Sequence, residues 1–364
     1  MKIMFDLTVL KEKPTGILNV TENIVTTYIR LFPQNQYVLV FQGKIMERFP
    51  IRTESDNVKI IVQTAPNQKR LYHLPKIMRE SDADWIICAS YPGPVLLNDP
   101  RVISVVHDLT CWKHPETMNW KLVRRWRAMI RHAVRTNRYI LNVSETVANE
   151  VRAKFHNKNS VAICNGVNIT EETDESILEK FSLKKDGYIH SVATLEPRKN
   201  LTVLLDAFSR MENRGNVKLV LTGAAGWKLQ DALGENADMV GSENLVFTGY
   251  VSNAELNALY RNAKLFVSAS VYEGFGLPVI EAVRNNLPVL VSDIPVYREI
   301  TNGLARYFPC HDAGVLAKRL EECLGQDLRR EPEFAELQEF AKQYTWENYV
   351  NKLNQLLENT PPVK

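Results

Sequence analysis

Two glutamates, Glu273 and Glu281, flank a glycine-containing loop. Its glycines permit a tight turn and a close backbone approach to a ligand, and Pro278 suits the first turn of a helix. Since loop amides and a helix N-terminus attract anions, the segment predicts a phosphate site. The loop residues expected to line it are Gly274, Phe275, Gly276 and Leu277.

The two glutamates themselves are unsuited to anion binding. Glu281 is expected in the first helical turn, and Glu273 before the loop. Carboxylates in these places accept hydrogen bonds from hydroxyl groups, so a sugar and a ribose are the predicted ligands. The alternative for either residue alone is a helix-dipole partner or a solvated loop acid.

A basic pair, Arg198 and Lys199, follows the first predicted strand of the second half of the chain. Parallel α/β sheets bind ligands at the carboxyl ends of their strands. Two positive charges at this place predict binding of a diphosphate and its stabilisation as a leaving group. A solvated basic turn is the alternative.

The first half of the chain offers two further candidates. Gly16, in the segment Lys13–Ile17, opens the first helix and would let it approach the diphosphate from the opposite wall, with an ordinary turn glycine as the alternative. His107 ends a strand run and is expected to face the cleft, with a capping or core histidine as the alternative. Asp82 and Asp84 form a D-x-D pattern, but they precede a strand, so we expect no metal site there.

A basic helix is predicted between Lys121 and Arg138, a segment with seven Lys or Arg and no acid. Four of its arginines fall within roughly an 80° sector at 100° per residue. Leu122 and Trp126 belong to the opposite, apolar face, which is expected on the core. The arginine face predicts contact with anionic headgroups or a lipid diphosphate acceptor. Its members are Arg124, Arg127, Arg131 and Arg135.

Short aliphatic runs alternate with segments of helical period throughout the chain, which indicates parallel sheets with helical crossovers. The expected strands are Ile3–Asp6, Tyr37–Phe41, Val58–Val62, Trp85–Cys88, Val102–His107, Arg138–Val143, Tyr188–Val192, Lys218–Thr222, Leu245–Thr248, Leu265–Ser268, Pro288–Ser292 and Ala305–Phe308. The expected helices include Thr21–Leu31, Trp120–Thr136, Leu201–Met211, Ala254–Asn262 and Pro278–Arg284.

The alternation of expected strands and helices is interrupted at Asn165–Asn168 and in the acidic stretch after it, where a turn and a linker are expected. A length of 364 residues also favours two domains. We therefore predict an α/β protein of two Rossmann-like doubly wound domains that face a central cleft. The expected ranges of the two domains are 1–168 and 169–344.

The bulk composition limits the class of protein. A net charge of +3 leaves anion binding to local clusters, and five widely spaced cysteines indicate reduced thiols in a cytoplasmic protein. No segment approaches the roughly 20 apolar residues of a membrane helix. No aromatic-interleaved basic strand or zinc pattern suggests nucleic acid.

Taken together, these motifs resemble the retaining glycosyltransferases of family four, which have the GT-B fold, and the resemblance covers nearly the whole chain. It implies that Glu281 binds ribose, that Glu273 touches the donor sugar and that His107 lies near the reacting sugar. It also places Gly223, Tyr250 and Val251 on the donor. It further implies that 1–168 binds the acceptor and 169–344 binds the nucleotide sugar, with a C-terminal helix at about 345–364 on the first domain. Arg198 and Lys199 would replace a metal, so no cofactor is expected.

The form Glu196–Asn200 resembles bacterial polysaccharide and O-antigen mannosyltransferases. The resemblance therefore implies transfer of a hexose, with mannose from GDP-mannose as the first choice, to a glycan or lipid-linked glycan at the inner face of the membrane. Rhamnosyl-, glucosyl- and N-acetylglucosaminyltransferases of the family are alternatives. A sugar-nucleotide epimerase or hydrolase of the same fold and a catalytically silent binding protein are the others.

Overall fold

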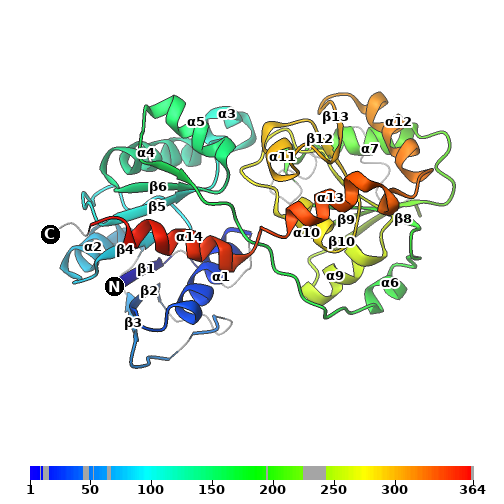
Figure 1. Cartoon of the computed structure of the whole chain (residues 1–364). Coiled ribbons are helices and arrows are strands. Elements are labelled where there is room, and N and C mark those ends of the chain that lie inside the picture. Colours follow the sequence, from blue (N-terminus) through cyan, green and yellow to red (C-terminus); the bar gives the residue numbers. More distant parts are fainter. Residues whose placement is uncertain are drawn as a thin grey trace. The chain divides into compact units, whose positions relative to one another are not determined.

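The computed structural model describes residues 1–8, 10, 16–43, 49–51, 53–63, 67–193, 196–223 and 243–361 (Figure 1). The chain divides into two compact units. Unit 1 comprises Met1–Gly166 and Tyr344–Lys364, and unit 2 comprises Val167–Gln343. The chain enters unit 2 within two residues of the boundary expected from the sequence.

Unit 1 contains a fully parallel seven-stranded sheet in the order β3-β2-β1-β4-β5-β6-β7. The strand order reverses between β1 and β4, as in a doubly wound sheet. Most strand positions are buried, because helices cover both faces of such a sheet. The strands are β1 (Lys2–Leu7), β2 (Gln36–Gln42), β3 (Val58–Gln63), β4 (Trp85–Cys88), β5 (Val102–Val106), β6 (Tyr139–Asn142) and β7 (Ser160–Ala162).

Three helices of unit 1 begin at polar residues that accept hydrogen bonds from the first turn. Asn119, Ser144 and Thr345 cap α4, α5 and α14 in this way. The last helix, α14, packs against α1, where the Tyr28 hydroxyl donates to Asn354 Oδ1 over 2.6 Å. The helices are α1 (Gly16–Leu31), α2 (Asn67–Glu80), α3 (Thr110–Lys113), α4 (Trp120–Thr136), α5 (Glu145–Phe155) and α14 (Trp346–Glu358).

Unit 2 contains a six-stranded parallel sheet in the order β10-β9-β8-β11-β12-β13. Its order reverses between β8 and β11, so the ligand crevice of a doubly wound sheet is expected outside the carboxyl ends of these two strands. The strands are β8 (Tyr188–Val192), β9 (Lys218–Thr222), β10 (Leu245–Gly249), β11 (Leu265–Ser268), β12 (Val289–Ser292) and β13 (Arg306–Phe308).

Helices of unit 2 cover this sheet, and a core of buried aliphatic side chains joins β8, β9 and β11 to α7 and α12. The helix α9 begins with a capping box between Ser252 and Glu255. The helices are α6 (Ser176–Lys180), α7 (Leu201–Arg210), α9 (Asn253–Asn262), α10 (Leu277–Arg284), α11 (Pro295–Ile300), α12 (Ala313–Leu324) and α13 (Pro332–Ala341). Two short 3₁₀ turns described in unit 2 are η2 (Pro197–Lys199) and η4 (Leu328–Arg330), and η1 (Pro115–Thr117) is a 3₁₀ turn of unit 1.

The prediction of two parallel, doubly wound sheets is confirmed. Every expected strand exists, and no strand end differs from the expected one by more than one residue. The sequence missed β7, because three residues at a sheet edge are too short to show a hydrophobic period. Within the described ranges, no helix combines the length and the hydropathy that crossing a bilayer requires.

Candidate functional site

The point where the strand order of unit 2 reverses carries three charged side chains. Arg198 and Lys199 lie in the turn η2, which follows β8. Glu273 lies in the segment between β11 and α10. Because β8 and β11 are parallel neighbours, these side chains meet at one edge of the sheet.

Glu273 is the centre of this group and is only 8% exposed. Its Oε2 accepts a hydrogen bond from the Arg198 guanidinium over 2.8 Å, and its Oε1 pairs with the Lys199 ammonium. Ser270 also donates to Oε1, over 2.7 Å. A carboxylate offers about four acceptor positions, so about one remains for a further hydroxyl.

The charges explain why a buried carboxylate stays ionised here. Burial by itself raises the pKa of Glu273, but the charges of Lys199 and Arg198, with hydrogen bonds from Lys199 and Ser270, lower it to about 2. Arg198 additionally pairs with Glu196 over 3.2 Å. The sequence suggested a basic pair open to a diphosphate, whereas the structure shows a network of two cations and two carboxylates.

The loop before α10 has the backbone expected of an anion site. Gly276 is the N-cap with a φ of 109°, no side chain caps the helix, and Pro278 lies in its first turn. The first N–H groups of a helix have no partner inside a regular helical turn, and such groups attract anions. In α10, Pro278 has no N–H and Val279 donates to the Gly276 carbonyl over 3.0 Å, so the Leu277 N–H is the first-turn donor left for a ligand among the described contacts. Phe275 is buried beneath the loop.

Glu281 lies in the second turn of α10, not in the first turn as the sequence suggested. The helix starts at Leu277, one residue before Pro278, its expected first residue. The Tyr260 hydroxyl of α9 donates to Glu281 Oε2 over 3.0 Å. Burial raises the pKa of Glu281, and the bond from Tyr260 offsets part of that rise.

Tyr260 is a site residue that sequence reasoning missed. Tyr260 is buried and precedes Glu281 by 21 residues in the chain. An aromatic residue on the inner face of α9 carries no signal that separates it from an ordinary core residue.

The strands β9 and β10 bring three more of the expected donor residues to the same edge of the sheet. Gly223 ends β9 with a φ of 146°, and its N–H donates to the Gly249 carbonyl over 3.0 Å. After β10, the Tyr250 side chain is 67% exposed while Val251 is buried. Of these two residues, Tyr250 is therefore the one whose side chain is accessible to a ligand.

His107 and Gly16 belong to unit 1. His107 follows β5, and its Nε2 donates to the Ala89 carbonyl over 3.1 Å. Burial lowers the pKa of His107, although the bond to Ala89 opposes this, so the neutral ring is favoured. Gly16 is the first residue of α1, and a Cβ there would meet no described atom within 4 Å. Lys13, Pro14 and Thr15 of the same loop lie outside the described residues, as do Thr194 and Leu195 of the Arg198 segment.

The basic helix α4 differs from its expected pattern in two places. Arg124, Arg131 and Arg135 are exposed, but Arg127 is half-buried and donates to the Cys111 carbonyl over 2.7 Å. Leu122 is 46% exposed, so its expected place on the core was wrong. The buried positions of the helix begin at Val123, and the core does not extend beneath Leu122 in the first turn.

The Asp82–Asp84 segment lies before β4, at the amino end of the strand as expected. Asp82 pairs with Lys2, and Asp84 accepts a hydrogen bond from the backbone of Lys2. Across the described residues, no group of three His, Cys, Asp or Glu side chains has a metal-binding arrangement.

Comparisons with known proteins agree with this arrangement. A family model described as "Glycosyl transferases group 1" matches residues 173–336, and one described as "Glycosyltransferase Family 4" matches residues 56–171. The O-antigen chain mannosyltransferase B of Escherichia coli is 30% identical over 258 residues, which are 68% of this chain and 68% of that protein.

Two further likenesses extend the comparison. The O-antigen chain mannosyltransferase RfbU of Salmonella typhimurium is 29% identical over 221 residues, 60% of this chain and 59% of that one. The crystal structure of HepE from Anabaena, in complex with UDP and glucose, superposes with a TM-score of 0.75 at 16% identity and covers 99% of this chain and 100% of HepE. At that identity the likeness is one of fold.

Proposed function

This chain belongs to the glycosyltransferases of family 4, and we propose that it transfers a hexose from a nucleotide-diphosphate sugar to a glycan acceptor. The observation that carries the proposal is the network of Arg198, Lys199 and Glu273 where the strand order of unit 2 reverses. This network lies at the same sheet edge as the uncapped N-terminus of α10.

The network suits a donor that carries both negative charge and hydroxyl groups. Arg198 and Lys199 supply two positive charges for the diphosphate, and the amides of Gly276 and Leu277 add donors at the helix N-terminus. Glu273 holds both cations in place and keeps about one acceptor position for a sugar hydroxyl. Glu281, oriented by Tyr260, accepts from the ribose.

In the proposed reaction, the bond between the anomeric carbon and the diphosphate oxygen breaks, and the acceptor hydroxyl forms the new bond on the same face. The acceptor proton passes to the departing diphosphate oxygen, so the configuration is retained and no protein base is needed. Arg198 and Lys199 stabilise the charge that develops on the leaving group. His107, held by Ala89, is proposed to lie near the reacting sugar.

Two positive side chains in this place lead us to propose that transfer needs no metal ion and no cofactor. Transfer should therefore continue in EDTA. Loss of transfer in EDTA, with recovery on addition of Mn²⁺, would contradict this part of the proposal.

The donor and pathway are proposed from the relatives. Two of them are O-antigen chain mannosyltransferases, so GDP-mannose is the first donor to test and polysaccharide synthesis the proposed role. HepE was crystallised with UDP and glucose, which makes UDP-glucose the second donor. Thermal-shift measurements with GDP, UDP, dTDP and their sugars would rank the donors, since a ligand that binds the folded state raises its melting temperature.

The catalytic assignment is tested by transfer of labelled sugar from the best donor. Arg198→Gln and Lys199→Gln should each lower kcat by about 10²-fold to 10³-fold, as expected for loss of a transition-state donor. Arg319→Gln changes an exposed arginine of the same unit and should leave kcat unchanged. Full transfer by the Arg198/Lys199 double variant would overturn the assignment.

We also propose that α4 contacts an anionic membrane surface. Trp120 is 61% exposed beside Leu122, and exposed Lys121, Arg124 and Arg125 surround them. Aromatic and aliphatic side chains with basic neighbours are typical of helices that lie in a membrane interface. Trp120→Ser with Leu122→Ser should lower cosedimentation with phosphatidylglycerol vesicles, whereas Ile169→Ser in unit 2 should not.

A further inference from the structure

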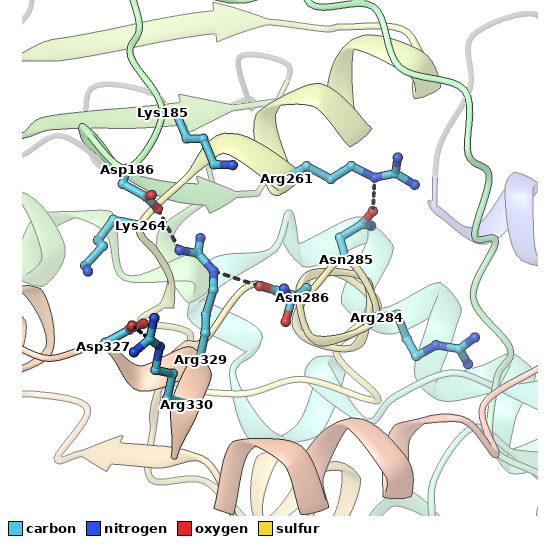
Figure 2. Close-up of a pocket in the computed structure, with 10 residues that line it drawn as sticks. All are labelled: Lys185, Asp186, Arg261, Lys264, Arg284, Asn285, Asn286, Asp327, Arg329 and Arg330. Atoms are coloured by element: carbon cyan, nitrogen blue, oxygen red, sulfur yellow. Dashed lines mark hydrogen bonds and ion pairs between the residues drawn. The ribbon is translucent and has the colours of Figure 1, made fainter. Parts of the chain in front are cut away.

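A concave site of unit 2 lies away from the network described above (Figure 2). We call it the basic pocket, and its volume is about 780 Å³. That volume is within the usual range of small-molecule sites. Its lining residues are Lys185, Asp186, Arg261, Lys264, Arg284, Asn285, Asn286, Asp327, Arg329 and Arg330.

The basic pocket is at the opposite edge of the sheet from the proposed donor site. Lys185 and Asp186 precede β8, and Lys264 directly precedes β11. Arg198 and Glu273 follow the same two parallel strands. Five strand residues at about 3.3 Å each separate the two edges by roughly 16 Å. One diphosphate cannot span both sites.

Its lining carries a large excess of positive charge. Six of the ten residues are basic and two are acidic. Both acids are already paired, Asp186 with Arg329 over 2.7 Å and Asp327 with Arg330 over 3.0 Å. Four cations therefore have no carboxylate partner among the described residues. These are Lys185, Lys264, Arg261 and Arg284.

Hydrogen bonds hold two arginines of the pocket, Arg329 and Arg261, in place. Arg329 donates to the Ala263 and Asn286 carbonyls over 2.6 and 3.1 Å, and Figure 2 shows its guanidinium between Asp186 and Asn286. Arg261 Nε donates to Asn285 over 3.3 Å, and its other nitrogens reach the Thr170 and Glu171 carbonyls. Groups fixed in this way lose little entropy when they bind a ligand.

We propose that the basic pocket binds a compact soluble anion with two or more phosphate groups, at a site separate from the donor site. The uncompensated cations supply the attraction, and the side-chain amide of Asn286 adds a donor for phosphate oxygens. Among the described residues, the lining contains no aromatic side chain on which a base could stack, so the phosphates are the recognised part. The concave shape favours a small anion over an extended acidic polymer.

The test is isothermal titration of the full chain with inorganic pyrophosphate, in the presence of a saturating nucleotide-diphosphate sugar that occupies the donor site. Lys185→Ser with Lys264→Ser removes two charges from the pocket without touching the anchored Arg329. Lys318→Ser with Lys352→Ser removes two charges at exposed positions outside it. Melting temperatures of all three proteins show that each is folded.

The expected result is pyrophosphate binding to the wild type and to the control. Binding to the pocket variant should be at least about tenfold weaker, the effect of losing charge-assisted hydrogen bonds. Equal binding to both variants, or no binding once the donor site is filled, would overturn the proposal. Heparin binding that depends on Lys185 and Lys264, without pyrophosphate binding, would also overturn it in favour of a polymer site. None of these outcomes depends on the proposed transfer reaction, which is measured separately.

Discussion

Glu273 joins two positive side chains that precede it by about 75 residues in the chain. An isolated buried carboxylate would be protonated or expelled to the surface, because removal from water disfavours its charge. Here the guanidinium of Arg198 and the ammonium of Lys199 compensate that cost. The same carboxylate therefore serves the stability of unit 2 and the position of the two groups assigned to the leaving diphosphate.

The low pKa of Glu273 predicts acid-sensitive stability. Because its folded pKa of about 2 is below the ordinary 4.5, the network stabilises unit 2 above about pH 4.5 and loses that stabilisation as the pH falls toward 2. The shift corresponds to about 3 kcal/mol. Urea unfolding between pH 7 and pH 2.5 should show this loss, and it should be smaller in Glu273→Gln.

Glu273→Gln should also be destabilised at pH 7, by about 3–5 kcal/mol, because the half-buried Lys199 loses its carboxylate partner and Arg198 keeps only Glu196. Glu322→Gln provides the matched control, since its ion pair with Arg319 is half-exposed and contributes less than about 1 kcal/mol. An unchanged pH profile in Glu273→Gln would show that other groups produce the acid sensitivity.

The bond from Tyr260 to Glu281 predicts a second pH effect, on donor binding. Since this bond lowers the pKa of Glu281, Tyr260→Phe should raise that pKa further. The carboxylate form accepts ribose hydroxyls, so donor affinity should fall at a higher pH in the variant than in the wild type. Titration of the nucleotide diphosphate from pH 5 to pH 8 measures the change.

Tyr188→Phe separates this effect from a general loss of stability. The Tyr188 hydroxyl is also buried and donates to the Leu259 carbonyl over 2.6 Å, in the same unit. Both variants should lose about 1–2 kcal/mol of unfolding free energy. Only Tyr260→Phe should alter the pH dependence of binding, and identical profiles would remove Tyr260 from the site.

At the scale of the elements, the site depends on how α10 begins. Parallel strands deliver their carboxyl ends to one edge, and the loop after β11 must turn at once into a helix there. Gly276 makes this turn with a φ of 109°, directly above Tyr297. The Tyr297 hydroxyl is itself bonded to Ser268 over 2.6 Å, so the ring has little freedom to move away.

Gly276→Ala is expected to damage both the fold and the site. Its Cβ would lie 2.7 Å from Tyr297 Cε1 and 3.0 Å from Ile300 Cδ1, in addition to the backbone strain. We expect a loss of about 2–4 kcal/mol in unfolding free energy and weaker nucleotide binding. Urea denaturation and nucleotide titration measure the two effects.

Gly215→Ala is the control for backbone strain alone. Gly215 also has a positive φ, of 58°, but a Cβ there would meet nothing within 4 Å. It should cost about 1 kcal/mol and leave nucleotide binding intact. Similar losses in the two variants would mean that crowding against Tyr297 does not matter.

At the scale of the whole molecule, the chain crosses between its units twice, and its last helix returns to the first unit. The returning α14 buries Trp346, Tyr349, Val350, Leu353 and Leu357 in unit 1. Its start lies against Gly166, the residue at which the chain leaves the same unit. The backbone where the chain leaves unit 1 is therefore in close contact with the backbone where the chain returns to it.

Gly166→Ala should loosen this contact. A Cβ at Gly166 would overlap backbone atoms of Thr345 and Trp346, which cannot rotate away as a side chain can. Hydrogen exchange should become faster in α14, and the unfolding free energy of unit 1 should fall by about 1–3 kcal/mol. Gly93→Ala, whose Cβ would lie at an ordinary 3.4 Å from Val102 Cγ1, should leave exchange in α14 unchanged. Unaltered exchange in Gly166→Ala would argue against a shared contact.

The sequence by itself determined the strands, the α/β class and the segments with binding chemistry. A buried parallel strand must be a short apolar run, and a helix N-terminus that approaches an anion needs glycine and permits proline, so these features are visible locally. The placement of Arg198, Lys199 and Glu273 at strand ends followed from the same rule.

The tertiary structure alone decided which of these segments meet. Because β8 and β11 are neighbours, Glu273 lies beside Arg198 and Lys199. The Tyr260 hydroxyl of α9 reaches Glu281 of α10 and donates a hydrogen bond to it. The basic pocket gathers residues from the opposite ends of the same strands. Local patterns record the burial and backbone preference of a segment, but the pairing of distant side chains depends on strand order and helix packing, which no single segment contains.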